Sequence, residues 1–135
     1  MIAIDTSALI AIVSRELAAE ACFNRLMEEQ KLLISAGTLA ETLIVAGRRN
    51  LLDEINRLAR DLQWDVVPVT LATINGIADA YATWGKGAHP AKLNLGDCFA
   101  YEVARRYDCP LLFVGDDFSK TDVRSALQGD AGSAR

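Results

Sequence analysis

Short apolar runs of strand length alternate along this chain with longer segments of helical periodicity. Strands separated by helices are joined by right-handed crossovers, which make the sheet mainly parallel. The pattern therefore predicts an α/β fold. The expected strands are residues 1–5, 31–35, 65–69 and 110–114, and the expected helices are 7–14, 16–29, 38–49, 51–63, 71–84 and 94–107, with a last short element at 119–127.

Two features of these strands predict their order in the sheet. Pro68 has no N–H to donate to a neighbouring strand, which places the third strand at an edge. The first and fourth strands are the least interrupted, which is typical of a buried centre. Their carboxyl ends carry Asp5 and the pair Asp116–Asp117, and ligands bind at that end of open α/β sheets.

The length of 135 residues predicts one domain that buries a sizeable core without disulfides. We expect residues 1–128 to form the domain and residues 129–135 to be a frayed tail. The three cysteines are an odd set without C-x-x-C spacing, which is typical of buried thiols in a reducing compartment.

No apolar run approaches the roughly 20 residues of a membrane span, and the N-terminus reads as a strand rather than a signal peptide. We therefore expect a cytoplasmic protein without a membrane partner.

A single histidine, His89, excludes an H-E-x-x-H zinc site and any site built on a histidine pair. The net charge of −4 lacks the basic surface typical of nucleic-acid-binding proteins. Any activity on nucleic acids must therefore depend on local positive charge and on a metal ion.

Acidic residues recur where the expected strands end and the expected helices begin. Each has an ordinary reading as a helix cap or a turn residue: Asp5 before Thr6-Ser7, Glu41 in a T-x-x-E capping box with Thr38, Asp97 three residues after Asn94, and Asp116-Asp117 after Gly115. Caps do not explain why the acids gather at one edge of one sheet. Because clustered carboxylates repel each other, the pattern favours a divalent metal, and oxygen ligands favour Mg²⁺ or Mn²⁺ over zinc.

Four segments resemble the PIN-domain ribonucleases, and more narrowly the VapC toxins of type II toxin–antitoxin systems. The resemblance runs from residue 1 to about residue 124, and its two later segments are the most specific. It implies a three-layer PIN-like fold with a central, mainly parallel sheet of four or five strands flanked by helices. It also implies a Mg²⁺-dependent endoribonuclease, a homodimer and a VapB-type antitoxin that blocks the active site. The segments are I-D-T-S-A-L (4–9), A-E-T (40–42), N-L-G-D-C-F-A-Y (94–101) and L-L-F-V-G-D-D-F-S-K-T-D (111–122).

The resemblance also implies roles for single residues. Asp5 and Asp97 match the main metal ligands, and Glu41 either completes the metal shell or orients the attacking water. The fourth acid is Asp116 or Asp117, depending on whether the glycine or the phenylalanine of G-D-D-F is aligned. By the same matching, Thr6 would bind a ligand water. Asp122 lies in the matching S-K-T-D stretch, but we interpret it as structural.

Positive charge is concentrated in the expected loop 84–92, which contains Lys86, His89 and Lys92. This loop is either a solvated connection or a surface that contacts RNA phosphate or a splayed base. His89 is a candidate proton donor to the leaving group. The pairs Arg48-Arg49 and Arg105-Arg106 lie near helix C-termini, where the helix dipole favours cations.

Two other functions remain open at this level. A phosphoryl-transfer α/β enzyme would use Asp5 as nucleophile, although the D-x-D pattern of such phosphatases is missing because residue 7 is serine. A non-catalytic module would only bind a partner, although such a surface has no need of clustered buried charge.

Overall fold

The computed structural model describes residues 1–127, whose strands form one four-stranded parallel sheet. The strand order is β3-β2-β1-β4, and every neighbouring pair is parallel. The predicted α/β class with a mainly parallel sheet is therefore confirmed. The strands are β1 (Ile2–Ile4), β2 (Leu32–Ser35), β3 (Asp65–Val67) and β4 (Leu111–Leu112).

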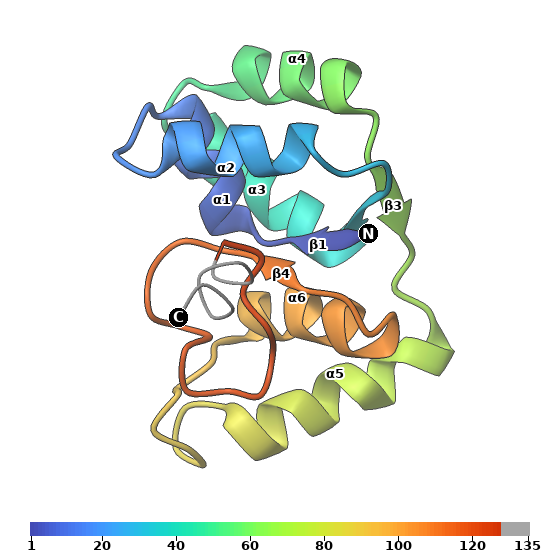
Figure 1. Ribbon diagram of the computed structural model, residues 1–135. Helices are drawn as coiled ribbons and strands as arrows, with labels where there is room; N and C mark the ends of the chain where they lie inside the picture. The colour runs from blue at the N-terminus through green and yellow to red at the C-terminus, as the bar shows by residue number, and fades with distance from the viewer. Residues whose placement is uncertain (128–135) are drawn as a thin grey trace, which may run out of the picture.

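Helices cover both faces of this sheet, so the predicted three-layer arrangement is also confirmed (Figure 1). One side carries α1, α2 and α4, and the other carries α6 with α5 packed outside it. Helix α3 contacts both α1 and α6 and so joins the two helical layers. The helices are α1 (Thr6–Val13), α2 (Ala19–Met27), α3 (Ala36–Arg48), α4 (Leu52–Leu62), α5 (Leu71–Trp84) and α6 (Leu95–Arg106).

The central strand β1 separates two hydrophobic clusters. Its side chains alternate between the faces of the sheet. Ala3 packs in the cluster that includes α5 and α6, whereas Ile2 and Ile4 pack in the cluster that includes α1, α2 and α4. All three side chains are fully buried. This burial fixes the end of β1, and therefore the position of the residue that follows it.

The sheet order differs from expectation at one strand. β3 lies at an edge as predicted, but β4 is the outer strand on the opposite side rather than a central one. Residues 124–126 run along its outer side, where Leu111 N donates to Arg124 O (2.8 Å) and Ala126 N donates to Leu111 O (2.9 Å). The expected element at 119–127 is neither a helix nor a strand: turns and bends flank a single bridge between Ser125 and Leu111. This covering segment explains why β4 is as apolar as a central strand.

The prediction of buried thiols is confirmed, since Cys22, Cys98 and Cys109 are all buried and free. Within the described chain, no helix has the length and apolar character needed to cross a membrane. The predicted frayed tail at 129–135 lies outside the described residues.

Helices α3 and α6 approach each other closely at Gly37. A Cβ atom added there would come within 2.5 Å of the Phe99 ring. Gly47, in the same helix, has room, because an added Cβ would meet the nearest Leu52 atom at 3.8 Å. The pair provides a matched test of the α3–α6 contact.

We expect Gly37→Ala to destabilise the fold by about 1–3 kcal/mol, the usual cost of inserting a methyl group where a neighbouring ring must shift. Gly47→Ala should instead be neutral or stabilise by up to about 1 kcal/mol, because alanine is the better helix former. Urea unfolding of both variants measures the difference. Equal effects at the two positions would contradict the close approach of α3 and α6.

Candidate active site

Asp5 lies directly after β1 and caps α1. Its Oδ2 accepts hydrogen bonds from Ser7 N (3.0 Å) and Ser7 Oγ (2.5 Å). Ser7 Oγ also accepts a hydrogen bond from Val114 N (3.0 Å), just beyond β4. The side chain of Asp5 is therefore tied to the carboxyl ends of two adjacent strands.

Glu41 is held between helices by contacts that reach across the fold. Its Oε1 accepts a hydrogen bond from Thr6 Oγ1 (2.7 Å), and Thr42 Oγ1 donates to the same threonine oxygen (3.0 Å). Its carboxylate lies against Gly96 in the first turn of α6, at a place that any Cβ would overlap. Glu41 is thus fixed from both α1 and α6. Thr6, expected from the resemblance to bind a ligand water, here orients this carboxylate.

The capping box expected between Thr38 and Glu41 is wrong. α3 begins two residues earlier, at Ala36, and its N-cap is Ser35, whose side chain accepts from Gly37 N (3.2 Å). Glu41 consequently lies in the second turn, where no backbone N–H of α3 needs it. Its carboxylate is available for interactions outside its own helix.

Asp97 forms the predicted capping box with Asn94. Asp97 N donates to Asn94 Oδ1 (2.9 Å), and Asn94 N donates to Asp97 Oδ2 (3.0 Å). The side chain is buried, with Asp97 only 8% exposed. The cap therefore fixes a buried carboxylate at the N-terminus of α6.

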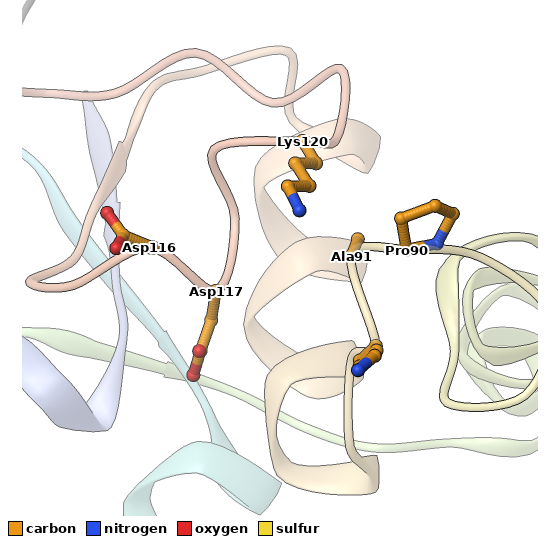
Figure 2. A pocket seen from close by; sticks show the side chains of 6 residues that line it. Pro90, Ala91, Asp116, Asp117 and Lys120 are labelled. Carbon is orange, nitrogen blue, oxygen red and sulfur yellow. The ribbon is translucent and has the colours of Figure 1, made fainter.

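One cavity of about 220 Å³ is lined by Asp5, Glu41, Asp97 and Asp117, and we call it the acidic cavity. Of the two candidates for the fourth acid, the structure places Asp117 in this cavity. Asp116 does not line it but faces a neighbouring one, and Figure 2 shows the two side chains leaving the loop in different directions.

Burial and mutual repulsion raise the pKa values of the two most enclosed acids. The pKa of Asp5 rises to about 6, mainly through burial, against the lowering effect of its hydrogen bonds from Ser7. The pKa of Asp97 rises to about 7, again mainly through burial, against the hydrogen bond from Asn94 N. The charges of Glu41 and Asp117 contribute to both increases. The cavity is therefore short of positive charge.

Arg49 and Ser7 are members of the cavity wall that the sequence reading missed. Arg49 is the C-cap of α3, which agrees with the interpretation that the helix dipole favours a cation at this position. Its NH1 lies 3.4 Å from Ser14 Oγ and 3.9 Å from Glu16 Oε2, at an exposed site. Only one feature of the sequence could have indicated Ser7: it lies two residues after the N-cap Asp5, where its N–H can donate to the aspartate side chain.

The donor chemistry of the acidic cavity fits a hard divalent cation. Among residues 1–127, no hydrogen bond engages Asp5 Oδ1, Asp97 Oδ1 or Glu41 Oε2, although the other oxygen of each carboxylate is held. In the same part of the chain, no three acidic, histidine or cysteine side chains are grouped tightly enough to hold an ion. Mg²⁺ needs only one or two direct carboxylates because it keeps several of its waters. Two direct carboxylates, with the other acids acting through water, would meet that requirement.

His89 and Asp122 lie outside the acidic cavity. The His89 ring packs edge-on against Trp84 with centroids 4.7 Å apart, and its Nδ1 accepts from Ala91 N (3.0 Å). Asp122 Oδ1 accepts from the buried Tyr101 hydroxyl (2.6 Å). These contacts agree with a structural role for Asp122 and give His89 the role of ordering its loop.

The sequence matches the family model described as "PIN domain" over residues 2–124. The chain belongs to the PIN-domain family. Among its relatives, VapC ribonuclease Mb2780c of Mycobacterium bovis is 38% identical over 127 residues, covering 91% of this chain and 97% of the relative. Ribonuclease VapC30 of Mycobacterium tuberculosis is 39% identical, covering 89% and 94%. The predicted membership among VapC-type PIN proteins is confirmed.

Solved structures show the same fold. Mycobacterium tuberculosis VapC20, described as a sarcin–ricin loop cleaving toxin, superposes with a TM-score of 0.74 at 16% identity, covering 91% of this chain and 96% of that one. A toxin–antitoxin complex from Klebsiella pneumoniae superposes with a TM-score of 0.68 at 17% identity, covering 90% and 93%. The predicted PIN-like fold is therefore confirmed.

Without metal, we expect the protein to lose stability as the pH rises from about 4 to about 8. The folded pKa values of Asp5 and Asp97 exceed the ordinary value of 3.8, so the folded state retains protons that the unfolded state has released. Their stabilising contribution is fully present below about pH 4 and is lost as the pH passes through about 6 and about 7. The loss is at most about 1.4 kcal/mol for each unit of pKa difference. Urea unfolding in EDTA across this range measures it.

Asp97→Asn should flatten this pH dependence, because the amide has no proton to lose and can still accept from Asn94 N. Asp61→Asn, an exposed change on α4, is the matched control and should keep the wild-type slope. A slope unchanged by Asp97→Asn would show that this carboxylate is not held protonated by the fold.

Proposed function

We propose that this protein is a VapC-type toxin, a Mg²⁺-dependent endoribonuclease that hydrolyses phosphodiester bonds of RNA in the cytoplasm. The observation that carries the proposal is the acidic cavity, where four carboxylates from separate segments meet and two of them are deeply buried. Burying like charges without compensation destabilises a fold. The ribonuclease names of the relatives agree with this reading.

In this proposal Asp5 and Asp97 hold Mg²⁺ through their unengaged oxygens, and Mn²⁺ can substitute for it. The bound ion would polarise the phosphoryl group and lower the pKa of water. Glu41, oriented by Thr6, positions the attacking water. Asp117 is the fourth acid, because it shares the cavity with the other three.

A VapB-type antitoxin is the proposed inhibitor, with an apolar groove between α3 and α6 as its docking surface. The groove has a volume of about 440 Å³, is lined by the exposed side chains of Ile44 and Leu95, and also includes Glu41. A segment bound in it lies next to the acidic cavity and would block the entry of RNA. The toxin–antitoxin complex among the similar folds is consistent with such a partner. A homodimer of the toxin belongs to the same proposal.

Cleavage assays with RNA and Mg²⁺ test the assignment of the acids. We expect Asp117→Asn to reduce the cleavage rate by about 10–100-fold, the usual effect of losing an outer-shell partner. Asp5→Asn and Asp97→Asn should reduce it further, since these remove direct ligands. Asp116→Asn is the matched control and should keep the wild-type rate, because Asp116 lies outside the cavity.

Full cleavage by Asp5→Asn or Asp97→Asn would show that the assigned site is wrong. A phosphoaspartate trapped at Asp5, or beryllofluoride binding there, would support the phosphoryl-transfer alternative. Folded wild-type protein that binds a partner but cleaves no RNA with either metal would support the non-catalytic module.

Metal binding is measured separately from cleavage by thermal unfolding. Millimolar Mn²⁺ should raise the melting temperature of the wild type, because a ligand that binds only the folded state stabilises it by mass action. The increase should be much smaller in Asp5→Asn, which loses a ligand. An unchanged melting temperature in the wild type would contradict a metal site in the cavity.

A further inference from the structure

A second cavity, of about 460 Å³, adjoins the acidic cavity, and we call it the lysine groove. It lies between the loop 85–93 and the segment 115–121. Its walls are Pro90, Ala91, Lys92, Asp116, Asp117 and Lys120 (Figure 2). Asp117 lines both cavities, so the groove continues directly from the proposed cleavage site.

Lys92 and Lys120 bring positive charge to this groove from its opposite walls. Figure 2 shows the Lys120 side chain extending into the space between the two loops. Across residues 1–127, neither lysine side chain forms an ion pair or a hydrogen bond, although two aspartates line the same groove. Five arginines in this part of the chain do have acidic partners, namely Arg25, Arg49, Arg105, Arg106 and Arg124. The two lysines therefore remain available for an anionic ligand.

Both walls of the groove are held in place by hydrogen bonds. Trp84 Nε1 donates to the Tyr101 hydroxyl (2.9 Å), which in turn donates to Asp122 Oδ1 (2.6 Å). This chain links the base of the loop 85–93 to the end of the segment that carries Lys120. A ligand that spans the groove therefore meets surfaces that are already ordered, which reduces the entropy cost of binding.

The backbone of Lys92 itself is in an uncommon conformation. Its φ of 54° lies in the left-handed region, which is unfavourable for a side chain such as lysine. Lys92 N donates to His89 O (3.0 Å), and Leu93 N donates to Trp84 O (3.0 Å), which holds this conformation. Strain of this kind persists only where the surroundings enforce it, and here it fixes the point at which the Lys92 side chain leaves the groove wall.

We propose that the lysine groove binds the backbone phosphates of RNA next to the cleaved bond, with Lys92 and Lys120 as the phosphate-binding residues. This inference rests on the proposed ribonuclease function and adds a substrate subsite to it. Lysine ammonium groups are suitable point-charge partners for phosphates. They also account for how a protein of net charge −4 holds a polyanion beside an acidic cavity.

The test is the affinity for a mixed-sequence single-stranded RNA of about 12 nucleotides, measured by fluorescence anisotropy in EDTA so that no cleavage occurs. We expect Lys92→Gln and Lys120→Gln each to weaken binding by about 3–10-fold and to reduce the salt slope by about 0.7. Lys92→Arg keeps the charge and should restore the affinity. Lys31→Gln, at the amino end of β2, is the matched control and should bind as the wild type does.

Asp116→Asn removes an anion from the groove and should strengthen RNA binding by about two-fold. Under Mg²⁺, the two glutamine variants should raise KM more than they lower kcat, because the lysines hold ground state and transition state alike. Melting temperatures close to that of the wild type would show that the changes act on binding rather than on folding.

Wild-type affinity in the Lys92→Gln, Lys120→Gln double variant would overturn the groove proposal, even if the protein cleaves RNA. If the double variant lost affinity for a poly-glutamate peptide but kept its affinity for RNA, the groove proposal would also be overturned. The groove would then be a protein-docking site. Lysine-dependent RNA binding by a wild type that cleaves no RNA would instead support the groove and contradict the proposed ribonuclease function.

Discussion

Carboxylates gather at the carboxyl end of the parallel sheet, and their repulsion in a buried site is the main physical constraint on the acidic cavity. Asp5 and Asp97 are almost fully buried, and the charges of Glu41 and Asp117 act on both. Such an arrangement costs stability unless a cation or protons offset it. The raised pKa values of Asp5 and Asp97 follow mainly from burial, and the repulsion adds to it. The fold therefore maintains an unfavourable local charge, which the cation of the proposed function would offset.

Local backbone chemistry is what keeps these charges in place. Asp5 is the N-cap of α1, and Asp97 is the third residue of α6 and pairs with the N-cap Asn94 in a capping box. Each carboxylate therefore uses one oxygen to stabilise a helix start and leaves the other free of hydrogen bonds. The contact between α3 and α6, permitted by Gly37 and Gly96, brings Glu41 to the same cavity. In the proposed function the same side chains would have both a structural and a catalytic role, because a capping hydrogen bond positions a carboxylate more firmly than a free rotamer does.

Much of this arrangement follows from sequence. The alternation of strands and helices predicted the parallel sheet, and the burial of β1 between two helical layers explains why Asp5 lies at a functional edge. The Asn94–Asp97 capping box could also be predicted, because its geometry is local.

Features that depend on non-local contacts were harder to predict from the sequence. Residues 124–126 cover β4, and no periodicity in the sequence indicates this pairing. The position of Glu41 in the second turn follows from a helix that begins at Ala36, whereas Thr38 suggested a later start. The choice between Asp116 and Asp117 required the path of the loop after Gly115, whose φ of 100° is accessible mainly to glycine.

A divalent cation held between Asp5 and Asp97 is the feature on which the proposed chemistry depends. Anomalous diffraction from crystals soaked in Mn²⁺ locates such an ion relative to each carboxylate. We expect an anomalous peak within about 2.0–2.6 Å of an oxygen of Asp5 and of Asp97, with Asp117 nearer to it than Asp116. A peak that touches neither aspartate, from crystals of protein that cleaves RNA in Mn²⁺, would show that the catalytic ion binds elsewhere.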